Sequence, residues 1–416
     1  MQSLRGTTDI LPDEINMWQE IYTKVHELLT LASYNEIRTP IIENTNLFKR
    51  SIGNNTDIIN KEMYSFQDQG NRNITLRPEG TASIARAFIS NQLYINKQLQ
   101  RLWYLGPMFR YERPQYGRQR QFHQLGIECI GSFSPMADVE VIRLAINILK
   151  ILQCKTYNLE INSIGNTEER HIFKDKLIEY LIKYENDLDN DSKKRLYINP
   201  LRILDSKDIR TQEILIEAPQ LYSFLQSNSL KHFNEICEHL EHLNIEYNIN
   251  KQLVRGLDYY NYTAFEIKTK EIGNQDTICG GGRYDTLIEQ LGGPKTPSVG
   301  WAIGIERLLI IIKDKLNIEK QGLSTYIAIQ GDNNKKYIWK IIEILENCKI
   351  KFELDLSNNN LQKQLKKANK SNATICLIIG ENEIINKNII IKYLKTGYQE
   401  KIQINNLHQY LYSLKN

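Results

Sequence analysis

The sequence has few features that direct a chain to a membrane or an oxidising compartment. Its six cysteines lie far apart with no Cys-x-x-Cys pair, which argues against a disulfide framework and a thiolate zinc site. Cys237, His239 and His242 lie in a polar helical stretch without a fourth ligand nearby, so we expect solvated side chains and no metal. No apolar run approaches a membrane span, and residues 1–6 resemble neither a signal nor a transit peptide. We therefore expect activity where the chain is made, without membrane association.

An excess of one charge is also absent. The net charge of +4 permits a polyanionic partner without requiring one, because local basic patches bind nucleic acid. The 416 residues, 41% hydrophobic and 25% charged, are ordinary for a soluble protein of two or three domains. Asn, Ile and Lys are frequent, a bias that indicates AT-rich coding and favours an organellar or reduced genome.

Residues 106–128 are the most informative segment, because they predict two strands joined by a strongly basic loop. Guanidinium groups are permanently charged and hold phosphate oxygens two at a time. Phe122 follows as a flat ring able to stack on a base, and Gln124 and Glu128 come after it. The segment predicts a nucleotide and a second polar ligand bound side by side; the alternative is an exposed basic hairpin that binds nothing. Its four arginines are Arg110, Arg113, Arg118 and Arg120.

Two further segments carry polar groups at the start of predicted helices. Glu79, Gly80 and Thr81 stand at a strand-to-helix turn and form a compact cup suited to an ammonium group. The alternative is that Thr81 only caps the helix expected over residues 82–91. Small residues then lead into an apolar helical pattern that places Arg307 where a helix approaches a pocket wall.

These segments resemble motifs 2 and 3 of the class II aminoacyl-tRNA synthetases, in the order that the family shows. Residues 253–260 bring Arg255, Gly256 and two tyrosines into the core sheet, and residues 279–285 contain three successive glycines that let a chain pack closely against a ligand. This pair resembles the two signatures that set histidyl-tRNA synthetases apart. The resemblance extends over the whole chain, with departures at Tyr262, Ala264 and Thr286.

The resemblance and the residue patterns together imply an α/β fold with three parts. A class II catalytic core with an antiparallel sheet is expected over residues 1–165 and 249–320, interrupted by a helical insertion over 166–248. A carboxy-terminal α/β anticodon-binding domain with a mostly parallel centre is expected over 325–416, after a linker at 317–324. Alternation of strand and helix patterns supports this last domain.

The amino-terminal part resembles motif 1, through which class II enzymes form homodimers. A helix is expected from residue 12 to about 32, because apolar residues recur on one face, and a strand over 36–42, where Pro40 demands an edge or a bulge. In the last domain, a helix over 361–369 carries a basic run that indicates either a solvated face or RNA contact. The basic residues are Lys363, Lys366, Lys367 and Lys370.

The resemblance implies how L-histidine is bound. Glu79 and Thr81 hold its α-amino group, with Gly80 leaving room for it. Glu128 and Tyr260 face the imidazole, since a carboxylate accepts from a ring N–H and a phenol both donates and accepts. The alternative for Glu128 is an ion pair with a nearby arginine.

The resemblance also implies how the reacting groups are held. Gln124 and Arg255 hold the histidine carboxylate in line with the α-phosphorus of ATP, and Tyr259 helps close the pocket. Arg110 and Arg255 grip the α-phosphate and serve as the catalytic residues, and Arg110 also borders the histidine. Phe122 stacks on adenine. Catalysis then consists of positioning and charge neutralisation.

Other arginines are assigned to the outer phosphates and the tRNA. Arg307 covers the other face of the adenine near the terminal phosphates, whereas Arg118 and Arg120 serve the outer phosphates or the acceptor end. Arg113 and Gln115 occupy the positions that read the extra 5′ guanosine of tRNA-His. ATP is expected as its Mg²⁺ complex, with no tightly bound cofactor.

Three other functions compete with a histidine–tRNA ligase. A regulatory paralogue of histidine biosynthesis usually lacks the carboxy-terminal domain and the Arg255 signature. An RNA-binding protein does not require Glu79, Glu128 and twin tyrosines beside arginines. A synthetase for proline or threonine does not need residues 255–260. The pattern favours the ligase, in the stroma of a plastid or in bacterial cytoplasm.

Overall fold

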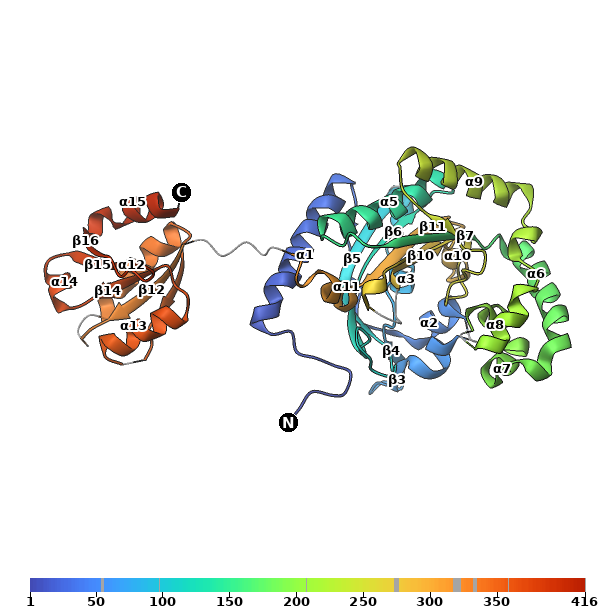
Figure 1. The fold of residues 1–416 in the computed structure, drawn as a ribbon, viewed down its shortest axis with the longest axis horizontal. Helices are drawn as coiled ribbons and strands as arrows, with labels where there is room; N and C mark the ends of the chain where they lie inside the picture. The colour runs from blue at the N-terminus through green and yellow to red at the C-terminus, as the bar shows by residue number, and fades with distance from the viewer. Residues whose placement is uncertain are drawn as a thin grey trace. The chain divides into compact units, whose positions relative to one another are not determined.

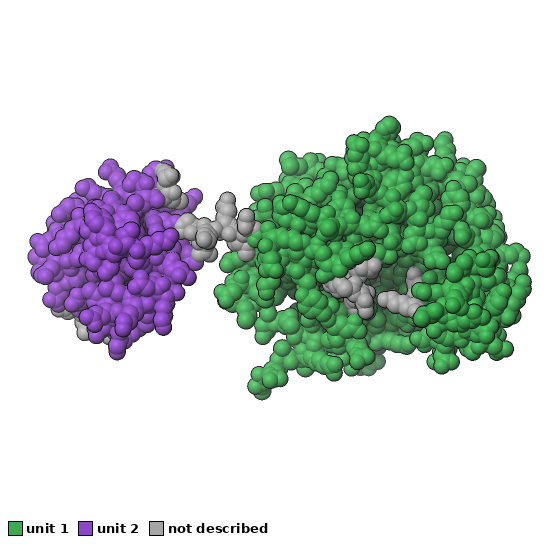
Figure 2. Space-filling model, in the orientation of Figure 1, with its two compact units in different colours: residues 1–318 green, residues 319–416 purple. Residues whose placement is uncertain are grey.

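The computed structural model describes residues 1–53, 56–96, 98–206, 208–272, 277–316, 323–331, 335–357 and 359–415. The chain divides into two compact units, residues 1–318 and 319–416 (Figure 2). Residues 317–322, most of the expected linker, lie outside the described residues. No helix within the described ranges is long and apolar enough to cross a membrane.

An eight-stranded sheet forms the centre of the first unit (Figure 1). Its β1–β5 and β7–β8 pairs are parallel and its other pairs antiparallel, so the expected antiparallel core is a mixed sheet with short parallel edges. In spatial order its strands are β1 (Asn35–Glu36), β5 (Gln100–Phe109), β6 (Gln121–Ile130), β11 (Ser298–Gly304), β10 (Thr277–Arg283), β9 (Asn261–Lys268), β7 (Asn158–Ser163) and β8 (Asn248–Ile249).

Helices α1 (Pro12–Leu31), α5 (Pro135–Ile151) and α9 (Ser227–His242) pack with α11 (Ile305–Ile312) against this sheet. The amphipathic pattern of α1 is confirmed, because Ile21, Val25 and Leu29 are buried. These side chains join one apolar cluster with strand residues of β5, β6 and β11. The helices therefore fix the sheet from one side.

The predicted strand over residues 36–42 is wrong as a single element. Strand β1 ends at Glu36, and β2 (Ile42–Asn44) belongs to a separate three-stranded sheet with β4 (Asn73–Leu76) and β3 (Tyr64–Gln67). Pro40 lies between them and, lacking an N–H, cannot donate to a ladder. From that small sheet the chain passes into α3 (Thr81–Ser90), beside α2 (Thr45–Ile52).

The segment 166–248, which we call the insertion, is helical as expected. Asn166 and Glu169 form a reciprocal capping box at the start of α6, and Glu169 also accepts from Ser229 at 2.7 Å on α9. Side chains of α6 share a buried cluster with core tyrosines. Its helices are α6 (Thr167–Leu181), η2 (Ile182–Asp187), α7 (Asn190–Ile198), η3 (Pro200–Asp205), α8 (Ile209–Ile216), η4 (Leu221–Phe224) and α9.

The second unit has a five-stranded sheet in the order β13-β12-β14-β15-β16. Its first three strands are parallel, but β15 and β16 pair antiparallel, so the expected parallel centre is only part of the sheet. The missed hairpin has a turn signal in Gly397, whose φ of 74° favours glycine. The elements are β12 (Ser324–Ile329), α12 (Lys335–Asn347), β13 (Lys351–Leu354), α13 (Leu361–Lys370), β14 (Ile375–Ile379), α14 (Glu381–Ile385), β15 (Asn388–Tyr393), β16 (Gln399–Gln403) and α15 (Ile404–Lys415).

Candidate active site

A cavity of about 200 Å³ lies among the amino terminus of α3, strands β6, β10 and β11, and the loop between β5 and β6. Residues from five distant parts of the chain line it, as the sequence patterns predict. Glu112, Leu257, Thr277 and Glu306 also line it and were not anticipated. The anticipated lining residues are Glu79, Thr81, Arg110, Arg118, Phe122, Gln124, Arg255, Tyr259, Tyr260 and Arg307.

Glu79 caps helix α3 from inside the cavity wall. Its carboxylate accepts from the backbone N–H groups of Thr81 at 2.8 Å and Ala82 at 2.7 Å. Burial raises the pKa of Glu79, and the two N–H groups and Arg110 oppose that rise. The alternative in which Thr81 caps the helix is therefore wrong, and the Thr81 hydroxyl has another partner.

Gly80 makes room for a protein side chain. A Cβ at Gly80, or at Gly126 on β6, would overlap the buried ring of Tyr104. The absence of a side chain at Gly80 thus serves the packing of Tyr104, and its role beside the histidine ammonium stays a prediction. Tyr104 was missed, and the small residues facing it at positions 80 and 126 are the signal that identifies its place.

Glu128 lies directly behind the cavity lining and is 1% exposed. Its carboxylate accepts from Thr81 Oγ1 at 2.7 Å and from the phenol of Tyr284. The alternative of an arginine partner is not found among the described residues. Burial raises the pKa of Glu128 to about 8 although both hydroxyls oppose the rise. Tyr284 was missed because its pairing spans 156 positions.

Three buried tyrosines pack together beside Glu128. The ring centroids of Tyr259 and Tyr260 are 4.6 Å apart, and those of Tyr259 and Tyr284 are 5.7 Å apart. Burial raises the pKa of all three phenols, so they remain protonated donors at neutral pH. Residues 253–260 lie in no strand, because β9 begins at Asn261; the expectation that they belong to the sheet is wrong.

Arg255 is fixed by an ion pair with Glu266 on β9. Burial alone lowers the pKa of Arg255, but the carboxylate of Glu266 raises it overall. A Cβ at Gly280 would overlap the guanidinium, so this glycine of the signature leaves space for Arg255. Thr277 also donates to Glu266 at 3.1 Å. Glu266 was not anticipated, yet it orients a central cation of the cavity.

Arg110 and Phe122 face each other across the basic hairpin, with the guanidinium carbon 5.3 Å from the ring centroid. Arg110 Nε donates to the carbonyl of Pro78 at 2.8 Å. Burial lowers the pKa of Arg110. Gln124 Oε1 is buried in the cavity wall without a hydrogen-bond partner among the described residues, and is therefore available to a ligand.

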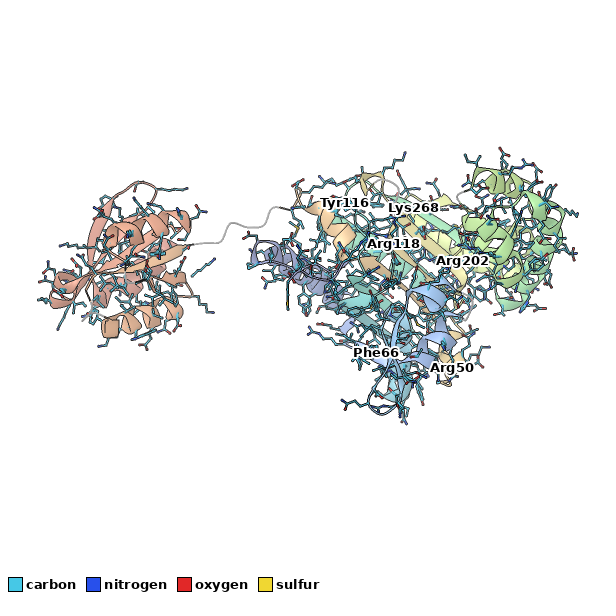
Figure 3. All side chains as sticks on the ribbon, turned by 90° about the horizontal axis from the view of Figure 1, so that it is seen from below. Arg50, Phe66, Tyr116, Arg118, Arg202 and Lys268 are labelled. Atoms are coloured by element: carbon cyan, nitrogen blue, oxygen red, sulfur yellow. The ribbon has the colours of Figure 1, made fainter. Side chains whose placement is uncertain are left out.

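The remaining arginines separate into two groups. Arg307 donates to the carbonyls of Gly117 at 3.1 Å and Thr277 at 2.9 Å, which joins α11 to the hairpin loop and to β10. Arg118, labelled in Figure 3, lines the cavity and pairs with Glu112. Arg120 lies outside the lining, with its guanidinium 3.9 Å over the ring of Tyr111.

The tip of the basic loop is a tight turn, of which Gly117 and Arg118 line the cavity while Gln115 and Tyr116 do not. Gln115 and Arg118 exchange backbone hydrogen bonds of 3.0 and 2.9 Å, and Gly117 has a φ of 72°. Arg113 and Gln115 are exposed there. Tyr116, labelled in Figure 3, is 73% exposed. The loop thus presents Arg110 and Arg118 to the cavity, and Arg113, Gln115 and Tyr116 to solvent.

Comparisons with known proteins agree along the whole chain. Residues 6–308 match the family model described as histidyl-tRNA synthetase, and residues 324–414 match one described as anticodon binding domain. The chain is 64% identical to the chloroplastic histidine–tRNA ligase of Gracilaria tenuistipitata var. liui over 100% of this chain and 99% of that protein. It is 50% identical to the histidine–tRNA ligase of Acaryochloris marina over 97% and 94%. The apo histidyl-tRNA synthetase of S. aureus superposes with a TM-score of 0.83, 35% identity and coverage of 99% and 100%.

Proposed function

Because the chain belongs to the histidyl-tRNA synthetase family and is therefore a histidine–tRNA ligase, we propose that the cavity of about 200 Å³ forms histidyl-adenylate. The supporting observation is the convergence of Arg110, Arg255 and Arg307 on one cavity that also contains Glu79 and paired tyrosines. Three separate chain segments supply the cations, so the site suits a polyphosphate held beside a small zwitterion.

The amino acid lies at the α3 end of the cavity in this proposal. The α-ammonium group contacts Glu79 and the Thr81 hydroxyl, and Gly80 contributes by admitting Tyr104. The imidazole contacts the phenol of Tyr260, and the carboxylate of Glu128 lies behind the lining, where it accepts from Thr81 and Tyr284. Tyr259 packs on Tyr260 and closes this end. A ligand without ring nitrogens cannot pair with the phenol of Tyr260, which gives discrimination.

Adenylate formation needs no covalent protein nucleophile. A histidine carboxylate oxygen attacks the α-phosphorus of ATP, the bond to the bridging oxygen breaks, and pyrophosphate leaves. Gln124 and Arg255 hold the carboxylate, and Arg110 and Arg255 contact the α-phosphoryl oxygens. Because Glu266 already orients Arg255, little rearrangement accompanies the development of charge in the transition state.

ATP lies toward the hairpin and α11 in this proposal. Phe122 stacks on the adenine, Arg307 covers its other face, and Arg118 serves the outer phosphates because it lines the cavity. Mg²⁺ enters with the nucleotide. Within the described residues no three metal-binding side chains cluster, and the lining carboxylates of Glu112 and Glu306 already contact Arg118 and His123.

The tRNA contacts lie at the exposed loop tip and in the second unit. Arg113 and Gln115 read the extra 5′ guanosine of tRNA-His, and Arg120 supports the loop near the acceptor end. In the anticodon-binding domain, α13 buries Gln364 and Ala368 and presents its lysines to solvent. These are Lys363, Lys366, Lys367 and Lys370.

A homodimer accounts for apolar side chains left exposed near α1 and the small sheet. Ile42 is 50% exposed and Phe66, labelled in Figure 3, is 48% exposed, with Leu11, Ile15 and Ile41 exposed as well. Such residues mark interaction surfaces when they gather.

The chloroplastic and cyanobacterial relatives support a plastid origin, as does the frequency of Asn, Ile and Lys, which indicates an AT-rich genome.

The regulatory alternative requires loss of the charging machinery. The chain retains Arg255 in a buried ion pair and an anticodon-binding unit, so the ligase is the function we propose. We test it by charging two tRNA-His transcripts, with and without the extra 5′ guanosine. Wild type should prefer the first, and Gln115→Ala should lose much of this preference while pyrophosphate exchange remains. Equal charging of both transcripts by wild type would contradict the loop assignment.

A further inference from the structure

The segment 253–260 carries Arg255, Tyr259 and Tyr260 but forms neither helix nor strand. It connects the two-residue strand β8 to β9. Backbone groups in such a segment need partners elsewhere, because no ladder supplies them. The partners found here determine where three residues of the cavity wall lie.

The insertion supplies two of these backbone partners and one side-chain partner. Arg202 Nη2 donates to the carbonyl of Gly256 at 2.7 Å, and Arg170 on α6 donates to the carbonyl of Tyr260. Asn199 Nδ2 donates to the carboxylate of Asp258 at 3.3 Å. The insertion therefore holds the segment at positions adjacent to Arg255, Tyr259 and Tyr260.

The contact with Arg202 is close as well as polar. A Cβ built at Gly256 would lie 3.2 Å from Arg202 Nη2 and 3.3 Å from Nη1. The guanidinium thus packs directly against the backbone next to Arg255. Arg202, labelled in Figure 3, belongs to η3 of the insertion.

Apolar packing also holds the segment, because Tyr259 and Tyr260 share a buried cluster with insertion side chains such as Phe173. A cavity of about 220 Å³ lies between parts of the insertion and the segment, and Arg170, Arg202, Leu257 and Asp258 line it. Arg255 lines this cavity and the active-site cavity alike. The core also holds the segment, since Asn162 Nδ2 donates to the carbonyl of Leu253 at 3.0 Å and the Ile52 carbonyl accepts from the N–H of Asp258 at 3.2 Å. Of these bonds, the one from Arg202 is made to the residue directly after Arg255.

We propose that Arg202, supported by Arg170, is a positioning residue that sets the histidine pocket from the insertion. It contacts no reacting atom. It fixes the carbonyl of Gly256, and thereby the directions in which Arg255 and the two tyrosines enter the cavity. This inference rests on the proposed function, because that function makes Arg255, Tyr259 and Tyr260 the residues that bind histidine.

The test compares full-length Arg202→Ala and Arg202→Lys with wild type in histidine-dependent pyrophosphate exchange. Arg202→Ala should lower kcat/KM for histidine about 10- to 100-fold, as expected when a charged hydrogen bond is lost and reacting groups are misplaced. The KM for ATP should rise less than the KM for histidine, because Arg255 is the ATP contact on this segment, whereas Phe122 and Arg307 lie on other elements. Arg202→Lys keeps the charge but not the fork and should recover part of the loss.

Arg210→Ala is the matched control. Arg210 lies on α8 of the same insertion, is exposed, and pairs with Glu213 at 2.8 Å, so its loss should leave both KM values unchanged. The inference would be overturned if Arg202→Ala kept the wild-type histidine KM and kcat. It would also be overturned if, in both Arg202→Ala and Arg202→Lys, the KM for ATP rose as much as the KM for histidine. Absence of exchange by wild type would instead contradict the proposed function.

Discussion

Thr81 and Glu128 are 47 positions apart, yet the hydroxyl of Thr81 donates to the carboxylate of Glu128 over 2.7 Å. This bond connects the amino terminus of α3, where Glu79 lies, to the strand that forms the floor of the cavity. The phenol of Tyr284 contacts the other carboxylate oxygen. A change in the charge of Glu128 therefore alters the hydrogen bonds of Thr81, proposed to bind the histidine ammonium group, and of Tyr284, which packs beside the tyrosines proposed to bind the ring.

The first prediction concerns recognition of the imidazole. Glu128→Gln keeps the size of the side chain and removes its charge. Above about pH 8 the carboxylate of Glu128 is ionised, and a hydrogen bond to a charged group contributes about 1.5–3 kcal/mol, so kcat/KM for histidine measured there should fall roughly 10- to 150-fold. The KM for ATP should hardly change. A variant with normal histidine kinetics and a lower melting temperature would show that Glu128 only supports the fold.

The second prediction concerns pH and stability. Burial raises the pKa of Glu128 from 4.5 to about 8 in the folded chain, so the folded state binds this proton more tightly than the unfolded state. Its contribution to stability is complete below about pH 4.5 and is lost as the pH rises through about 8. The melting temperature of ligand-free wild type should therefore fall more steeply than that of Glu128→Gln between about pH 5 and pH 8. Parallel curves would contradict the assignment.

The third prediction concerns charge at the α-phosphoryl group. Arg255→Ala should lower the single-turnover rate of adenylate formation by about two to three orders of magnitude, comparable to the loss of one oxyanion donor. Histidine binding, measured by equilibrium titration, should weaken less. Near-normal single-turnover chemistry would mean that the group that stabilises this charge is another residue.

The fourth prediction concerns assembly. Sedimentation at micromolar concentration should give about twice the chain mass. Replacing the exposed Ile41 and Ile42 with Glu should shift the equilibrium toward monomer, because like charges then face each other across a symmetric contact. A monomeric and fully active wild type would rule out the dimer proposal.

Local patterns predicted the elements that depend on neighbours in sequence. The apolar spacing of Ile21, Val25 and Leu29 predicted α1, and the basic hairpin 106–128 appears as β5, its loop and β6. Contacts between residues far apart in the sequence could not be predicted from local patterns. Tyr104 occupies space left by Gly80, and Tyr284 reaches Glu128 from β10's end, so neither pairing has a local signature.

The same limit explains the errors in the cavity wall. Arg255 was identified from its signature, but Glu266, which orients it, follows eleven residues later on β9 without a distinguishing motif. Arg118 and Arg120 are alternate residues of one loop, and only packing of Arg120 on Tyr111 separates their directions. The strand expected over residues 36–42 is broken at Pro40 because its two halves join different sheets. Strand propensity does not specify which sheet a segment joins.

Amino-acid-dependent exchange of pyrophosphate into ATP, measured without tRNA for each of the twenty amino acids, tests the central claim most directly. Histidine alone should support exchange, because its ring nitrogens can pair with Tyr260 and the Glu128 network while its carboxylate reaches Arg255. Exchange with proline or threonine but not histidine, or no exchange with any amino acid, would contradict the assignment of this cavity to histidine activation.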